Sequence, residues 1–145
     1  MKFEYFIFDD YLNHKKIINN VVKNIFKSNT LLKIIKSKKI FSVSFSIVLV
    51  DNLKGKKLNK YFRQKNTIPD ILSFPFDERE KNKYILGDIV ITPKMLEKNY
   101  PTIKEGYLKL LIHGLLHLLG FDHIKDNDFK IMSRFENMIY QELNN

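Results

Sequence analysis

Three of the four histidines of this chain fall within eleven consecutive residues, in the segment HGLLHLLGFDH from His113 to His123. His113 and His117 are four residues apart, so on a helix their side chains lie on the same face, one turn from each other. Gly120 stands where the chain would leave that helix through a left-handed conformation, which glycine adopts without steric penalty. The spacing therefore allows His123 to return toward the other two imidazoles and predicts a metal site.

Three neutral imidazoles around a tetrahedral ion leave the fourth position to water, which is the arrangement of a catalytic rather than a structural zinc. A water bound in this way ionises near neutral pH and becomes a nucleophile. We therefore expect one Zn²⁺ ion, although the same ligands also accept nickel, cobalt or copper. The alternative is that the histidines of the helix are core residues, because leucines surround them: Leu115, Leu116, Leu118 and Leu119.

The spacing of the three histidines and the glycine is also that of the metzincin proteases. In those enzymes the residue after the first histidine is a glutamate that serves as general base. Here that position is Gly114. The motif therefore indicates a metal site and disfavours a peptidase of that class.

Positive charge is concentrated in the first half of the chain. The segment from Tyr11 to Lys65 contains fourteen lysines or arginines and one acid, Asp51, whereas the whole chain carries a formal net charge of +9. A concentration of this kind is typical of proteins that bind a polyanion, most often nucleic acid. The alternative is an ordinary solvated helix face in a lysine-rich chain.

Length and composition limit the number of domains, the cysteine chemistry and the membrane association that we expect. A chain of 145 residues predicts a single domain, residues 1–145, with a core of its own. The absence of cysteine excludes disulfides, cysteine-based zinc fingers and iron–sulfur clusters, and it is consistent with a reducing compartment. No apolar run approaches the ~20 residues of a membrane span. We therefore expect a cytoplasmic protein that has no membrane partner.

Hydrophobic periodicity predicts a single compact α+β domain, in which a mixed sheet of about four strands has flanking helices and the metal-site helix lies near the C-terminus. The aromatic residues Tyr5, Phe6, Phe8, Phe41 and Phe45 could stack on bases, but at strand positions we expect them to fill the core. The predicted strands are residues 2–8, 41–50, 71–76 and 84–92, with a charged loop from Asp77 to Lys83. The predicted helices are residues 13–37, with a break near Ser28, then 53–63, a short helix from Pro93, 105–119 and 126–143.

Three stretches, in matching order and spacing, resemble the YbeY family of bacterial rRNA maturation factors, which are metal-dependent endoribonucleases. The first is HGLLHLLGFDH, residues 113–123, which is similar to the three-histidine signature of the family. The second is LNKYFRQKNTIPDILSFPF, residues 58–76, in which Arg63 follows Asn59 by four residues and an LSFP strand comes next. The third is LGDIVIT, residues 86–92.

The resemblance implies a role for particular residues. His113, His117 and His123 would be the zinc ligands, and Arg63 would be the catalytic residue needed for cleavage. A guanidinium stays protonated at physiological pH, so Arg63 would act by holding a phosphate through two hydrogen bonds and stabilising developing charge, not as a base. Without the resemblance, Arg63 would be read as an ordinary exposed cation.

The resemblance also implies a function, namely a zinc-dependent, single-strand-specific endoribonuclease that acts in rRNA maturation, at the 16S 3′ end, and in ribosome quality control. Its partners would be single-stranded rRNA and the ribosome or ribosomal proteins. The alternative is a non-catalytic RNA-binding ribosome-assembly factor whose metal is structural. A metal-dependent hydrolase of peptides or small molecules is a third possibility, which Gly114 and the basic segment disfavour.

Further residues near these motifs are secondary candidates. Ser73 and Phe74 would line a groove beside the metal or serve only in the strand. Asp88 would either orient a ligand histidine or cap a turn, and Asp122 would fix the histidine loop through a backbone hydrogen bond or take part in catalysis.

Overall fold

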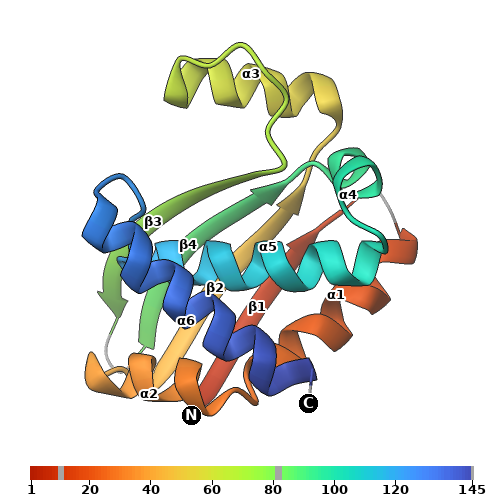
Figure 1. Cartoon of the computed structure of the whole chain (residues 1–145). Helices are drawn as coiled ribbons and strands as arrows, with labels where there is room; N and C mark the ends of the chain where they lie inside the picture. Colours follow the sequence, from red (N-terminus) through yellow and green to blue (C-terminus); the bar gives the residue numbers. More distant parts are fainter. Residues whose placement is uncertain (10–11, 81–82, 145) are drawn as a thin grey trace.

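The structure is a computed structural model of the 145-residue chain, and it describes residues 1–9, 12–80 and 83–144 (Figure 1). None of the helices within these ranges is long and apolar enough to cross a membrane. The elements follow in the order β1 (Lys2–Phe8), α1 (Leu12–Ile25), α2 (Asn29–Ser37), β2 (Ser42–Leu49), α3 (Asn52–Arg63), β3 (Ile71–Glu80), β4 (Lys83–Ile91), α4 (Pro93–Asn99), α5 (Ile103–Leu118) and α6 (Asp126–Asn144).

The four strands form one mixed sheet in the order β1-β2-β4-β3. β1, β2 and β4 run parallel, and β3 pairs antiparallel with β4. Parallel neighbours need a crossover, which α1 and α2 supply between β1 and β2. The prediction of a single α+β domain with a four-stranded mixed sheet is confirmed.

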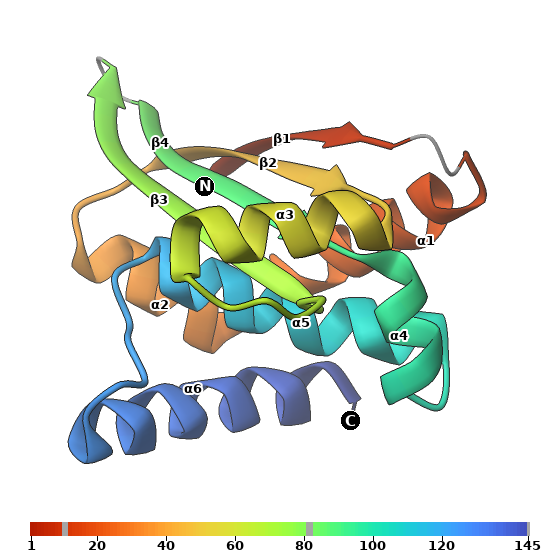
Figure 2. The same cartoon turned by 90° about the horizontal axis from the view of Figure 1, so that it is seen from above.

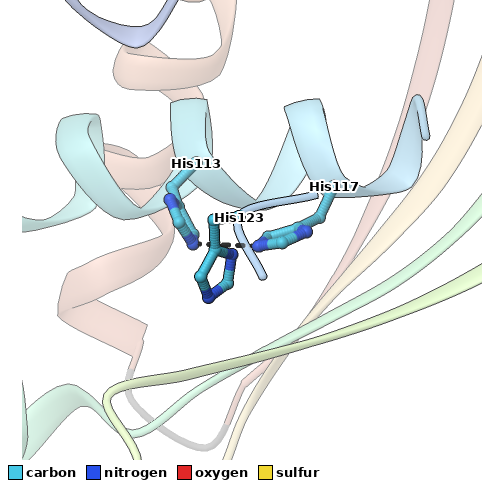
Figure 3. Close-up of side chains that lie close together, drawn as sticks. All are labelled: His113, His117 and His123. Carbon is cyan, nitrogen blue, oxygen red and sulfur yellow. Dashed lines mark hydrogen bonds between the residues drawn. The ribbon is translucent and has the colours of Figure 1, made fainter. Parts of the chain in front are cut away.

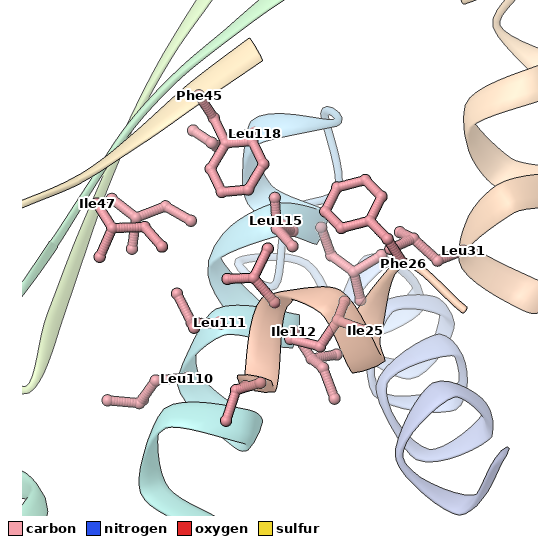
Figure 4. Packing of buried hydrophobic residues seen from close by; sticks show 14 of the residues in the cluster. Ile25, Phe26, Leu31, Phe45, Ile47, Leu110, Leu111, Ile112, Leu115 and Leu118 are labelled. Carbon is pink, nitrogen blue, oxygen red and sulfur yellow. The ribbon is translucent and has the colours of Figure 1, made fainter. Parts of the chain in front are cut away.

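Helices α1, α2, α5 and α6 lie on one face of the sheet, and the main hydrophobic core lies between them and the strands (Figures 1 and 2). Alternate residues of the strands, such as Phe45 and Ile47 of β2, point into this core. Leu111 and Leu115 of α5 lie in the same core (Figure 4). Because α5 contacts the sheet on one side and α6 on another, most of its residues are buried, and the helix is held rigidly.

A second, smaller core lies on the other side of the sheet, where Val50, Leu72 and Val90 are buried. Leu58 of α3 packs against this cluster, so α3 is anchored across the end of the sheet at which β2 ends (Figure 1). Asn59 of α3 is also buried, and its Nδ2 donates a hydrogen bond to the carbonyl of Thr67 at 2.9 Å. These contacts fix the helix that carries Arg63.

The predicted break near Ser28 is confirmed, because Ser28 is the N-cap of α2 and its Oγ accepts a hydrogen bond from the backbone N–H of Leu31. The predicted loop from Asp77 to Lys83 is wrong. β3 continues to Glu80 and β4 starts at Lys83, while Lys81 and Asn82 lie outside the described residues. Antiparallel pairing with β4 satisfies the backbone of this segment, whatever the charge of its side chains.

The prediction that the five aromatic residues fill the core is correct for Phe45 and in part for Tyr5, which packs half-buried against it, and wrong for Phe6, Phe8 and Phe41, which are exposed. β1 is an edge strand, and alternation puts Phe6 and Phe8 on the more exposed side, while Phe3, Tyr5 and Ile7 pack against the core. Phe41 precedes the first residue of β2.

The C-terminal end of α6 is tied to the start of α2 through the carboxylate of Glu142. Ser28 Oγ donates a hydrogen bond to Glu142 Oε2, and Thr30 donates to Oε1 from both its hydroxyl, at 2.6 Å, and its backbone N–H, at 3.2 Å. Burial alone would raise the pKa of Glu142, but these hydrogen bonds outweigh that effect and hold its pKa below the ordinary value of 4.5. The ionised carboxylate therefore stabilises the fold.

We expect Glu142→Gln to lower the free energy of unfolding at pH 7 by about 0.5–1 kcal/mol, because the site is largely exposed and water screens it. A group with a depressed folded pKa stabilises the fold above its unfolded pKa, and this contribution is lost as the pH falls through the folded value. The difference between the two proteins should therefore shrink below about pH 4.5 in thermal melts. Glu97→Gln, at an exposed position of α4, is the matched control and should leave stability unchanged at either pH.

Candidate metal centre

The histidine helix ends where the sequence predicts. Gly120 has a φ of +101°, the backbone N–H of Gly120 donates to the carbonyl of His117 at 3.0 Å, and that of Phe121 donates to Leu116 at 3.0 Å. This pair of bonds is the left-handed helix end that glycine favours. The chain then turns back along α5, and the expected return of His123 is confirmed.

The three imidazoles lie together at the end of α5 (Figure 3). His113 Nε2 and His117 Nε2 are 3.1 Å apart, and one ring nitrogen from each of the three histidines lies within 4.8 Å of the others. Two nitrogen ligands at about 2.0–2.1 Å from one tetrahedral ion stand about 3.3 Å apart. His113 and His117 therefore already have the separation that a shared ion needs. His123, the most exposed of the three, completes the site from the loop that follows α5.

The hydrogen bonds of the first two rings determine which nitrogen is free. His117 Nδ1 lies 2.9 Å from the carbonyl oxygen of Phe121, which only accepts, so Nδ1 carries the proton. His113 Nδ1 donates in the same way to Glu136 Oε1 at 2.9 Å. In the neutral rings both Nε2 atoms then present lone pairs to each other at 3.1 Å, an arrangement that a cation between them stabilises. The donor set therefore fits a metal ion.

The electrostatics of the site keep the imidazole of His117 in the neutral form that binds a metal. Burial and then the neighbouring charges of His113 and His123 lower the pKa of His117 to about 4, although the hydrogen bond to Phe121 opposes them. A metal ligand must be the neutral imidazole. His117 is therefore neutral, with its Nε2 lone pair available, throughout the neutral pH range.

Glu136 is a part of the site that the sequence analysis missed. It lies on α6, 23 residues beyond His113, and its carboxylate accepts the Nδ1–H of that ring. Carboxylates in this position fix the tautomer of a ligand histidine and raise its basicity. The sequence indicates that Glu136 lies in the predicted last helix. Nothing in the sequence of that helix shows which of its turns faces the histidines.

We expect Glu136→Ala to weaken metal affinity about 10- to 100-fold, because the ring of His113 loses the partner that orients it. Glu136→Gln keeps an acceptor without the charge, so its affinity should lie between those of Glu136→Ala and the unsubstituted protein. Affinities are measured by competition with a chromophoric chelator. Glu97→Gln should bind as the unsubstituted protein does, and equal affinity of Glu136→Ala would show that the contact is not part of the site.

Gly114, the position where metzincins have their glutamate, faces the sheet. A Cβ at this position would stand 3.0 Å from Cδ1 of Ile71 and 3.1 Å from Cδ1 of Ile89. The glycine therefore allows α5 to approach β3 and β4 closely, and a glutamate has no room there. The geometry agrees with the expectation that the site lacks the carboxylate base of that protease class.

Arg63 and two of the histidines line one cavity of about 560 Å³. Arg63 is the last residue of α3, and Gln64 ends the helix with a φ of 56°. The cavity is lined by Arg63, Lys65, Ser73, Pro75, His117 and the residues from Gly120 to Ile124. The structure thus brings Arg63 to the same opening as the histidines, although they are fifty residues or more apart in the sequence.

The structure gives a different position to each of the secondary candidates. Ser73 lines the cavity, whereas the ring of Phe74 contacts Phe62 of α3. Asp122 Oδ1 accepts the backbone N–H of His123 at 2.7 Å, so the expected hydrogen bond that fixes the loop is present. Burial raises the pKa of Asp88, and a hydrogen bond from Ser46 opposes this. The Nδ1 atoms of His113 and His117 have Glu136 and the carbonyl of Phe121 as partners instead of Asp88.

A second cavity, of about 470 Å³, borders His113. It lies among α5, α6 and the start of β3, and its lining includes Asp70, Tyr100, Lys109, His113 and Tyr140. The histidine cluster therefore borders two cavities, one at His113 and the other at His117 and His123.

Comparison with known proteins agrees with this geometry. The family model described as "Endoribonuclease YbeY" matches residues 8–144. A protein named "Endoribonuclease YbeY" from Pelagibacter ubique is 43% identical over 123 residues, which cover 78% of this chain and 80% of that protein. One of the same name from a Sulfurihydrogenibium species is 36% identical over 138 residues, with 91% of each chain covered.

Among solved structures, TM1509 from Thermotoga maritima has a similar fold. The comparison gives a TM-score of 0.57 and 25% sequence identity, over 97% of this chain and 91% of that one. The helices and strands that carry the histidines and Arg63 therefore belong to an architecture already known from experiment.

Proposed function

Because this chain belongs to the YbeY endoribonuclease family, we propose that it is a zinc-dependent endoribonuclease that cuts single-stranded RNA. We place its action in rRNA maturation, at the 16S 3′ end, and in ribosome quality control, in the cytoplasm and with the ribosome or ribosomal proteins as partners. Residues 1–145 act as one domain. The observation that carries the proposal is the cavity that His117, His123 and Arg63 share.

His113, His117 and His123 would hold the ion, each through one ring nitrogen. When bound, such an ion polarises a phosphoryl oxygen and lowers the pKa of a bound water toward neutrality. The hydrogen bonds from the Nδ1 atoms to Glu136 and Phe121 keep the first two rings in the metal-binding tautomer.

Arg63 would bind the phosphate that is cut. Its guanidinium forms two parallel hydrogen bonds to phosphate oxygens and stabilises the charge that develops on them. Lys65 lines the same cavity and adds a second positive charge. This pair gives the cavity the charge that a phosphodiester requires.

The site offers little help with proton transfer. Among the described residues that line the Arg63 cavity, the one carboxylate is Asp122, which already accepts the backbone N–H of His123. Glu136 is hydrogen-bonded to His113. We therefore expect slow cleavage by the isolated protein, with ribosomal partners supplying the positioning that raises the rate.

The alternative is a ribosome-assembly factor that binds RNA without cutting it and uses its metal structurally. The observation that favours it is the hydrogen bond between His113 and Glu136, which links α5 to α6 next to the metal position. In that case removal of the metal should unfold the domain. The nuclease proposal instead expects cleavage to stop while the fold persists.

The test is incubation of the purified protein with an end-labelled RNA fragment that spans the 16S 3′ end, with a chelator and then with zinc restored. We expect cleavage that the chelator stops and zinc restores, with an unchanged circular dichroism spectrum. Cleavage that survives the chelator would overturn the zinc proposal. Unfolding in the chelator would favour the structural-metal alternative.

A further inference from the structure

The last turn of α3 exposes two consecutive aromatic side chains directly before Arg63. Tyr61 is 76% exposed and Phe62 is 52% exposed. Single exposed apolar residues are common, but adjacent aromatic rings beside a functional cavity form a patch that indicates an interaction site. Neither ring belongs to the two buried clusters, and α3 is anchored through Leu58 and Asn59.

The two rings are held nearly at right angles to each other. Their centroids are 4.8 Å apart, with an interplanar angle of 78°. Phe62 in turn meets Phe74 of β3 edge to face, at 4.9 Å and 68°. The contact with the strand supports Phe62, and Phe62 supports Tyr61, so the exposed ring faces point in different directions.

The cations around these rings are free to bind an anion. Lys57 lies one helical turn before Tyr61, and Lys60 lies immediately before it; both are exposed. In the described part of the chain, no carboxylate forms an ion pair with Lys54, Lys57, Lys60 or Arg63. The nearest acid in the sequence, Asp51, caps the far end of the helix through the backbone N–H of Lys54.

We propose that Lys57, Lys60, Tyr61 and Phe62, here called the α3 platform, bind two unpaired bases of the RNA strand that enters the Arg63 cavity. The inference rests on the proposed endoribonuclease function and assigns the residues that select its substrate. Aromatic rings beside a positively charged track are the usual way in which proteins bind single strands, because every base has a face that stacks. The lysines neutralise the phosphates between the bases.

The angle between the rings explains why the strand must be unpaired. A base on Tyr61 and a base on Phe62 would be turned almost perpendicular to each other. Neighbouring bases in a duplex are parallel and covered on both faces, so a double helix offers no faces to the platform. The α3 platform thereby selects single strands before the phosphate reaches Arg63.

A fluorescent variant tests the stacking directly. The chain has no tryptophan, so Tyr61→Trp introduces a single reporter on the platform, and Leu53→Trp introduces one at an exposed position about 12 Å away along the same helix. The metal-loaded proteins are mixed with an unstructured oligoribonucleotide or with a duplex, and fluorescence is read in a stopped-flow instrument before cleavage. We expect strong quenching of Tyr61→Trp by the single strand only, and little change in Leu53→Trp. Equal quenching at both positions would overturn the platform.

Affinity and cleavage give the second measurement. Tyr61→Leu/Phe62→Leu keeps apolar bulk at both positions but removes the rings, and Leu53→Ala is the matched control. We expect the double variant to bind the single strand at least about 30-fold more weakly, with its metal content and duplex affinity unchanged. Single-strand affinity equal to that of the control, or an equal loss for single strand and duplex, would overturn the inference while leaving the nuclease proposal intact. Failure of the proposed function would instead show as an unsubstituted protein that neither binds nor cuts RNA.

Discussion

His117→Ala is expected to abolish metal-dependent cleavage while the domain stays folded. The substitution removes one of three ligands, and the remaining histidines, one on the helix and one on an exposed loop, cannot complete the site. Loss of a polarising ion withdraws several kcal/mol of transition-state stabilisation, so we expect cleavage to fall at least about 1000-fold. Metal content by mass spectrometry should drop from one ion per chain to none.

The fourth histidine supplies the control for this experiment. His14 lies on α1, where its Nδ1 is 2.6 Å from the hydroxyl of Tyr107, remote in sequence from the cluster. His14→Ala should lose some stability through that contact, yet retain one ion per chain and full cleavage. Cleavage that persists in His117→Ala would mean a contaminating nuclease or a wrong site. Loss of the circular dichroism signal in that variant would point to the structural-metal alternative.

Arg63→Ala should retain the metal and lose cleavage by about 100- to 1000-fold, as expected when one preorganised donor to a developing oxyanion is removed. Arg63→Lys keeps the charge but not the planar pair of donors, so it should recover only part of the activity. Initial rates on the labelled RNA fragment, with metal content measured on the same samples, separate the two effects.

Arg134→Ala is the matched control for this substitution, because Arg134 is an exposed arginine of α6 that does not line the Arg63 cavity. The Arg134→Ala variant should cut RNA at the same rate as the unsubstituted protein. If Arg63→Ala cut as well as Arg134→Ala, Arg63 would be an ordinary surface cation and the assignment would fail. If Arg63→Ala lost its metal, the effect would be structural and not catalytic.

Much of the architecture follows from local patterns in the sequence. Alternation predicts β1 and β2, and helical spacing predicts α1 and α6, because one face of each element must enter the core. The nearly all-apolar second half of α5 predicts that helix as one buried on most sides. The histidine cluster is also local, since four-residue spacing and the left-handed turn at Gly120 place all three rings within one short segment.

What could not be predicted depends on contacts between distant segments. The strand order β1-β2-β4-β3 and the direction of each strand arise from packing of the whole sheet, which no single element encodes. Glu136 reaches His113 only because α6 docks on α5 in one register. The continuation of β3 to Glu80 depends on its partner strand, and charged residues gave no local sign of it.

The compact arrangement of the metal ligands also bears on the order in which the protein matures. All three imidazoles come from a stretch of eleven residues, so an ion held there closes only a very short loop of the unfolded polypeptide and restricts its chain entropy little. The apolar interior that clamps α5 is assembled from distant strands and helices without any contribution from those rings. We therefore expect folding to precede metal loading, so that a cell short of the metal accumulates a folded apoprotein that can be loaded later, instead of an unfolded chain that is degraded.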